Sequence, residues 1–107
     1  MHQQKTIPIT DILYIYQDGN YQFIHYVSEG KVHEEKERRS MKKLLSIMSP
    51  YPQFKSCHES YLINTYKIEF VSIIDGKKKL KLKGIDTPLN ISKQYRNDFN
   101  QFLQSKK

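Results

Sequence analysis

The chain has 107 residues and a formal net charge of +7, from 18 Lys and Arg against 11 Asp and Glu. This length predicts one domain over residues 1–107, with a modest core between about 7 and 103 to which 8 Tyr and 5 Phe contribute. A single cysteine excludes an internal disulfide framework and suits the cytoplasm, and no apolar run approaches the roughly 20 residues of a membrane-spanning helix. The four histidines and the cysteine lack the spacing of a metal site, so we expect no metal and no cofactor.

The positive charge is concentrated in the second half of the chain. Residues 1–50 hold 7 basic and 6 acidic side chains, a balance of +1, whereas residues 51–107 hold 11 and 5, a balance of +6. A basic half favours a polyanionic partner, because neutralised phosphates release condensed counterions. On charge alone this interpretation is only slightly ahead of the alternative that lysines keep a small β domain soluble and protect its edges.

The first half of the chain predicts strands. Residues 7–9, with Pro8 in the middle, predict an edge strand, and residues 12–16 predict a second strand. A turn at residues 18–20 leads to residues 21–27, which carry bulky side chains on both faces and predict a central strand. Residues 31–38 are almost wholly charged and predict an exposed edge strand, with a linker as the alternative.

A helix and further strands follow. Ser40 is placed to cap a helix that ends before Pro50, and its apolar positions are Met41, Leu44, Leu45 and Met48. Residues 68–74 predict a strand, Asp75–Gly76 a hairpin turn, and residues 79–83 a half-buried strand with a basic outer face. Residues 86–91 predict a last edge strand. Ser92 is then expected to cap a final helix with Tyr95, Phe99, Phe102 and Leu103 on one face.

Residues 54–64 form a run with no Gly or Pro, which predicts a short strand that leads into a tight turn or a single helical turn. We expect its apolar side chains to anchor it in the core and its polar side chains to lie at the surface. The expected anchors are Phe54, Tyr61, Leu62 and Ile63, and the expected surface residues are Lys55, His58, Glu59 and Ser60.

Three kinds of chemistry find little support. Cys57 and His58 are adjacent and point to opposite faces of a strand, so they cannot pair as nucleophile and base. The four glycines are isolated and form no phosphate-binding loop, and no carboxylate pair is visible.

The lysine run Lys77–Lys78–Lys79 suits contact with phosphates about as well as it suits a solvated hairpin tip. Binding of this run to an anionic membrane is disfavoured, because no helix of the chain strongly combines a basic and an apolar face.

Four segments, in order, resemble the LytTR family of bacterial DNA-binding domains. Residues 54–64 match its central Phe-x-Arg-x-His-Arg-Ser-Tyr-Leu-Val-Asn pattern at most positions, although Glu59 stands where a basic or amide residue is usual. Residues 12–21 resemble the early hairpin of the family, residues 40–44 its Ser-Leu-x-x-Leu helix start, and residues 91–96 its closing Val-Ser-Arg-Arg-Tyr. The resemblance covers roughly residues 7–103 and implies an elongated set of small antiparallel sheets, about ten short strands, with minor helices. The pattern along the chain itself predicts one helix in the middle and one at the C-terminal end.

The resemblance also implies where DNA is read. In the family, side chains from an early hairpin, from the position after the signature histidine and from the position after the last strand contact bases. These positions fall near Gln22, Glu59 and Lys93, whose amide, carboxylate and ammonium groups suit adenine, cytosine and guanine. The expected DNA-contacting residues are Gln22, Lys55, His58, Glu59, Lys77, Lys78, Lys79, Lys93, Gln94 and Arg96. For His58 we weigh a structural role, holding the turn through backbone hydrogen bonds, slightly higher.

We therefore interpret the chain as a mostly β, non-catalytic domain that binds double-stranded DNA sequence-specifically in a bacterial transcriptional regulator. In the family such a domain often follows a receiver domain, so we expect either the output domain of a two-component response regulator, with the receiver outside this chain, or a stand-alone regulator. The resemblance also implies that two domains, as a homodimer on DNA, bind neighbouring repeats. The alternative is a small β-type RNA-binding or protein-interaction module, which exposed aromatic residues on a sheet face would favour.

Overall fold

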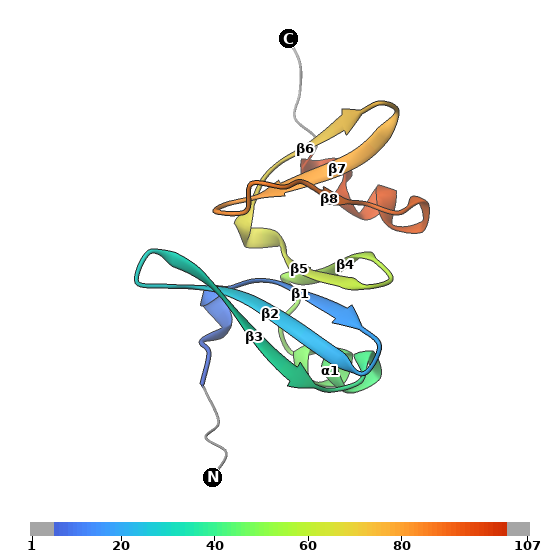
Figure 1. Cartoon of the computed structure of the whole chain (residues 1–107). Helices are drawn as coiled ribbons and strands as arrows, with labels where there is room; N and C mark the ends of the chain where they lie inside the picture. Colours follow the sequence, from blue (N-terminus) through green and yellow to red (C-terminus); the bar gives the residue numbers. More distant parts are fainter. Residues whose placement is uncertain (1–5, 103–107) are drawn as a thin grey trace.

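The computed structural model describes residues 6–102, without the side chains at positions 96, 97 and 100–102. Its strands form two antiparallel sheets that lie one above the other in Figure 1 and give the molecule an elongated shape. The first sheet has the order β3-β2-β1-β5-β4 and the second the order β6-β7-β8. The strands are β1 (Ile12–Asp18), β2 (Tyr21–Ser28), β3 (Lys31–Arg38), β4 (Phe54–His58), β5 (Tyr61–Asn64), β6 (Ile68–Ile74), β7 (Lys77–Leu82) and β8 (Leu89–Asn90).

The helical elements are few and short. The α-helix α1 (Met41–Met48) lies against the first sheet, and the 3₁₀ segments are η1 (Ile9–Asp11), η2 (Thr65–Lys67) and η3 (Lys93–Phe102). The expected class, mostly β with small antiparallel sheets, a middle helix and a C-terminal helical segment, is confirmed. Over residues 6–102 the structure has eight strands, fewer than the about ten that the resemblance implies.

The structure has two hydrophobic cores. The first core forms where α1 and η1 cover one face of the five-stranded sheet, and it includes Ile15, Ile24, Leu44 and Leu62. The second core forms where β4 and β5 meet the three-stranded sheet and η3, and it includes Cys57, Ile63, Leu80 and Phe99. Residues 54–64 contribute to both cores, because successive residues of a strand point to opposite faces of the sheet.

Three local predictions are confirmed. Ser40 caps α1, since its Oγ accepts a hydrogen bond from the backbone N of Lys43 at 3.1 Å. The charged residues 31–38 form β3 at the edge of the five-stranded sheet, where charges oppose pairing with another strand. Strand β6 has the predicted bounds, and Asp75 and Gly76 form the hairpin turn with φ of 54° and 76°.

The prediction of an edge strand over residues 7–9 is wrong. Pro8 instead precedes the single turn η1, and the backbone O of Pro8 accepts a hydrogen bond from the backbone N of Asp11 at 3.0 Å. Ile7 and Ile9 pack against the first core. The apolar pattern correctly indicated that Ile7 and Ile9 pack against the core, but they do so from a helical turn and its approach rather than from a strand.

The last predicted elements also differ in detail. The edge strand expected over residues 86–91 is reduced to β8, with Pro88 just before it. Ser92 does not cap the following helical segment, because its Oγ is buried with no hydrogen-bond partner among the described residues. The apolar face predicted there includes buried Phe99 and partly buried Tyr95, while the side chain of Phe102 and all of Leu103 lie outside the described residues.

Residues 54–64 form the hairpin β4–β5, with Glu59 and Ser60 in its turn. Phe54, Leu62 and Ile63 are buried as expected, whereas Tyr61 is only half-buried. Asn64 is buried and joins two segments: its Nδ2 donates to Ile12 O at 2.9 Å, and its Oδ1 accepts from Tyr66 N at 3.0 Å. The hairpin is therefore fixed to β1 and to the linker that leads to the second sheet.

Candidate nucleic-acid interface

Three chain segments that are distant in sequence meet along one edge of the molecule. These segments, which we call the recognition edge, are the β1–β2 turn (17–21), the β4–β5 turn (58–61) and the β8–η3 junction (90–94). They lie on the right side of Figure 1. The backbone N of Gln17 donates to Ser60 O at 2.7 Å, and the backbone N of Ser92 donates to Cys57 O at 2.9 Å. These two hydrogen bonds link the three segments in a row.

The recognition edge presents polar and charged side chains to solvent. Glu59 is exposed in the β4–β5 turn, and Lys93 and Gln94 are exposed at the start of η3. Lys55 is exposed on β4, one strand length from that turn. No ion pair joins Glu59 to a described residue. The structure thus brings Glu59, Lys93 and Gln94 together, while the side chain of Arg96 lies outside the described part.

The predicted lysine run lies at the tip of the β6–β7 hairpin, further along the same side in Figure 1. Lys77 is exposed, whereas Lys78 and Lys79 are partly buried by their neighbours. Lys81, on the same strand, pairs with Glu69 at 3.2 Å and is therefore partly neutralised. This hairpin tip adds positive charge beside the recognition edge.

His58 holds the β4–β5 turn. Its Nδ1 accepts a hydrogen bond from the backbone N of Ser60 at 3.2 Å, and its ring meets Tyr61 edge to face with centroids 5.6 Å apart. This contact is the structural role that the sequence favoured for His58. The ring is half-buried. Its contacts with Ser60 and Tyr61 hold Glu59 and Ser60 at the tip of the turn.

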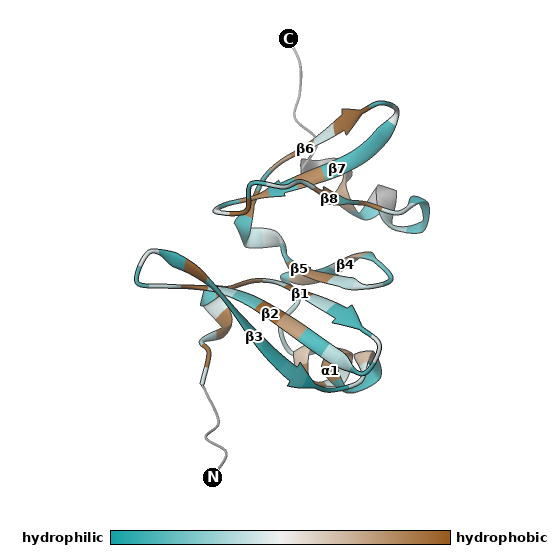
Figure 2. Cartoon of the chain, viewed as in Figure 1, coloured by the Kyte–Doolittle hydropathy of each residue, from teal (hydrophilic) through white to brown (hydrophobic). Residues whose placement is uncertain are grey.

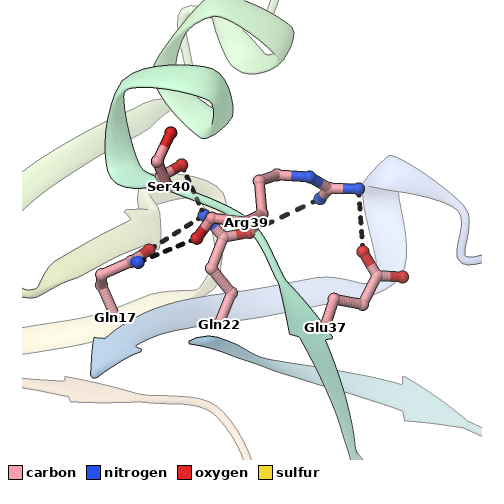
Figure 3. Close-up of polar contacts among 5 residues, drawn as sticks. All are labelled: Gln17, Gln22, Glu37, Arg39 and Ser40. Atoms are coloured by element: carbon pink, nitrogen blue, oxygen red, sulfur yellow. Dashed lines mark hydrogen bonds and ion pairs between the residues drawn. The ribbon is translucent and has the colours of Figure 1, made fainter. Parts of the chain in front are cut away.

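Gln22 requires a correction. Its side chain is 0% exposed and lies in a hydrogen-bond network rather than on the surface, as Figure 3 shows. Its Nε2 donates to Gln17 Oε1 at 2.9 Å and to Ser40 O at 3.1 Å, and its Oε1 accepts from Arg39 at 3.5 Å. A buried amide with these partners cannot reach a DNA groove, so we remove Gln22 from the expected contacts.

The residue before Gln22 takes the exposed position. Strand β2 alternates, so Gln22, Ile24 and Tyr26 face inward while Tyr21 faces outward with 40% of its surface exposed. Lys36 Nζ lies 4.4 Å from the centroid of the Tyr21 ring. The alternation was visible in the sequence, but it could not indicate which of the two faces is covered.

Cys57 is a buried structural residue. It is 0% exposed, and its Sγ donates to Asn90 O at 3.5 Å. Burial raises the pKa of the Cys57 thiol from its ordinary value of 9.0 to about 12. The nucleophilic thiolate is therefore suppressed at neutral pH, which also argues against Cys57 as a nucleophile.

The aromatic residues on the face of the first sheet opposite α1 mostly contact one another, and Tyr14 and Tyr61 also pack against the second core. Tyr14 stacks on His25 at 4.3 Å, Tyr16 on Phe23 at 6.2 Å, and Tyr61 lies 5.2 Å from Tyr16 between ring centroids. Burial raises the pKa of Tyr14 and of Tyr61. Rings occupied in this way offer no row of free faces for unpaired bases, so the RNA-binding alternative is not favoured.

Over residues 6–102 the structure contains neither a group of side chains suited to a metal ion nor a helix long and apolar enough to cross a membrane. The polar arrangement that remains is the recognition edge. Loop tips held at one edge of a small β domain, with lysines beside them, suit a domain that contacts nucleic acid through its loops.

The comparisons with known proteins identify the family. Residues 2–104 match the family model of the LytTr DNA-binding domain, so the chain belongs to the LytTR family. A solved structure described as the LytTr DNA-binding domain of a "methyl-accepting/DNA response regulator" from Bacillus cereus is similar in fold. It has a TM-score of 0.65 and 14% sequence identity, over 90% of this chain and 84% of that chain. No match was found among curated proteins.

Proposed function

We propose that this LytTR domain binds double-stranded DNA sequence-specifically through the recognition edge and serves as the output domain of a bacterial transcriptional regulator. The observation that supports this proposal most is the pair of backbone hydrogen bonds, Gln17 N to Ser60 O and Ser92 N to Cys57 O, which fix the three segments side by side. Side chains that read bases must be held at fixed positions relative to one another, because each bidentate contact depends on geometry.

Within the recognition edge, we assign base contacts to the exposed side chains that the turns hold. Lys93 begins η3 beside the backbone link to Cys57, and its ammonium group suits guanine. Glu59 suits the amino group of cytosine, and Tyr21 replaces Gln22 as the exposed residue of the early hairpin. Gln94 is exposed next to Lys93, and Arg96 stays a proposed contact because the family resemblance implies it.

We assign phosphate contacts to lysines around this edge. Lys77 at the hairpin tip and Lys55 on β4 are exposed, and Lys78 and Lys79 follow Lys77 on the same strand. Contacts of this kind position the protein and carry no direct sequence information. They make binding salt-dependent, with a slope of log K against log salt of about −0.9 for each phosphate neutralised.

The experiment that tests this division is selection of binding sites from random duplexes by three variants. Lys93→Ala should cost about 1–3 kcal/mol and relax the preference at one base pair. Lys77→Ala should weaken binding to all sequences alike and reduce the salt slope by about 1. The matched control is Lys31→Ala, which changes an exposed lysine at the far β2–β3 turn and should leave binding nearly unchanged. Wild-type base preferences for Lys93→Ala would contradict its role as a reader.

The wider context is also a proposal. The Bacillus cereus relative belongs to a protein described as a response regulator, which supports a receiver domain joined to this domain in the full protein. Two such domains would occupy neighbouring repeats, with loops in successive major grooves. Because bacterial chromosomal DNA lies in the cytoplasm, the proposed function places the chain there. The proposal assigns the domain no catalytic step.

A further inference from the structure

The β1–β2 turn reaches furthest from any buried side chain within the recognition edge. Its two residues, Gly19 and Asn20, connect the cross-strand pair Asp18 and Tyr21, and residues 18–21 are all exposed. Gly19 has a φ of 62°, which a two-residue hairpin turn requires and glycine adopts readily. Figure 2 shows the end of β1, which leads into this turn, as hydrophilic. Because apolar packing does not anchor the turn, hydrogen bonds must fix its position.

Both carbonyl groups of the turn accept a hydrogen bond. Asn20 O accepts from the backbone N of Arg39 at 3.0 Å, and Gly19 O accepts from the side-chain Nε2 of Gln17 at 2.8 Å. The first donor is a backbone group that any residue except proline supplies. The second donor belongs to one particular side chain, so the identity of residue 17 decides whether Gly19 O is bound.

The amide of Gln17 is held in a single orientation. Its Nε2 also donates to Arg39 O at 2.9 Å, and its Oε1 accepts from Gln22 Nε2 at 2.9 Å (Figure 3). Carbonyl oxygens only accept, so the Nε2 of Gln17 must face Gly19 and Arg39. The backbone N of the same residue donates to Ser60 O at 2.7 Å. Gln17 therefore ties the β1–β2 turn both to the β4–β5 turn and to the segment that enters α1.

We propose that Gln17 is a positioning residue for DNA recognition: its side chain fixes the β1–β2 turn so that Tyr21 meets the duplex in one orientation. This inference rests on the proposed function of the recognition edge. Base contacts depend on geometry, and a turn that must be ordered on binding loses affinity through the entropy of ordering. Phosphate contacts depend far less on this geometry, so the tether should matter for a selected site and not for a random duplex.

The first test is Gln17→Met, which keeps the length of the side chain and removes its amide. Affinity for the selected site should fall about two- to tenfold, whereas affinity for a random duplex should stay unchanged. In site selection this variant should relax the base pairs that Tyr21→Ala relaxes and keep the preference that Lys93→Ala relaxes. An unchanged ratio of the two affinities would overturn the proposal, and so would a lost preference only at the base pair of Lys93.

The matched control is Gln22→Ala, because it separates positioning from a loss of stability. This change removes the hydrogen bond to Gln17 Oε1 but leaves both acceptors of Gln17 Nε2 in place. It should lower stability and leave the ratio of the two affinities at the wild-type value. If Gln22→Ala and Gln17→Met change this ratio equally, the effect is general destabilisation and the proposal fails.

A measurement without DNA tests the tether by itself. In ¹⁵N relaxation of the whole chain, the amides of residues 18–21 should have lower order parameters in Gln17→Met than in the wild type, while residues 58–61 stay unchanged. A turn equally rigid in both proteins would overturn the tether even where DNA binding holds. If the wild type prefers no duplex, the proposed function fails and the role in recognition fails with it, whereas a loosened turn would still establish the tether.

Discussion

At the scale of single residues, Gln22 is the clearest example of a polar side chain with a structural role. Its amide joins Gln17 near the end of β1, Arg39 just after β3 and Ser40, which caps α1. A buried amide that satisfies several partners stabilises the fold only while all of them are present, since each orphaned group then costs the free energy of desolvation.

We therefore predict that Gln22→Ala lowers the free energy of unfolding by about 1–3 kcal/mol. The side chain has no route to solvent, so the base preference of the folded variant should equal that of the wild type. Urea denaturation and site selection measure the two quantities. Gln94→Ala, at an exposed position, is the stability control. A Gln22→Ala variant with wild-type stability and altered base preference would show that the network assignment is wrong.

Glu59 is the residue at which this chain departs from its family. An exposed carboxylate beside DNA is repelled by phosphate, and a hydrogen bond from cytosine N4 is the contact that offsets this repulsion. The alternative, an ion pair with Lys55, is not formed in the structure, because no ion pair joins Glu59 to a described residue.

We predict that Glu59→Gln raises the affinity for random duplex and erodes discrimination at one cytosine. The neutral amide removes the repulsion, but it also removes an acceptor that matched that base. Titrations of the selected site and of a random duplex give the ratio of the two affinities. A ratio equal to that of the wild type would remove Glu59 from the proposed readers.

At the scale of elements, the β4–β5 hairpin depends on the ring of Tyr61. This ring contacts Tyr14, Tyr16 and His58, with centroids 5.9, 5.2 and 5.6 Å away, and so joins the turn to β1. Tyr61 is half-buried rather than fully buried, so we expect its removal to cost less than the removal of a core aromatic residue.

Tyr61→Ala should lower the free energy of unfolding by about 1–3 kcal/mol, below the roughly 3–5 kcal/mol typical of a fully buried ring. Tyr61→Phe keeps the ring contacts and serves as the control, with stability close to that of the wild type. Thermal melts compare the variants. An unchanged melting temperature for Tyr61→Ala would mean that the aromatic contacts do not anchor the hairpin.

Many elements were predictable because local physics determines them. The spacing of Leu44 and Met48 behind Ser40 predicts α1, and the Asp75–Gly76 turn fixes the hairpin of the second sheet. The strand over residues 7–9 failed because an apolar pattern with a proline fits both an edge strand and a buried turn. The predicted DNA contact of Gln22 was wrong because the alternation of side chains separates the two faces of β2 but does not indicate which face α1 covers.

At the scale of the whole molecule, the recognition edge was not readable from composition, periodicity or spacing. Gln17 and Ser60, or Cys57 and Ser92, are joined by backbone hydrogen bonds across long stretches of chain, and nothing local to either residue indicates its partner. The family resemblance supplied the positions near residues 22, 59 and 93. The structure then removed the first of them, since Gln22 is buried, and it shows Tyr21 as the exposed neighbour.

The central claim is that DNA binds along the recognition edge, and backbone amide chemical shifts during titration with a selected duplex test it most directly. The account predicts the largest shifts in three groups, at residues 17–21, 58–61 and 90–94, with smaller shifts near Lys77. Amides of the β2–β3 turn, Glu29 and Gly30, lie at the opposite end of the first sheet in Figure 1 and should not shift. Shifts centred on the β2–β3 turn or on the face of α1, with the recognition edge unchanged, would contradict the account.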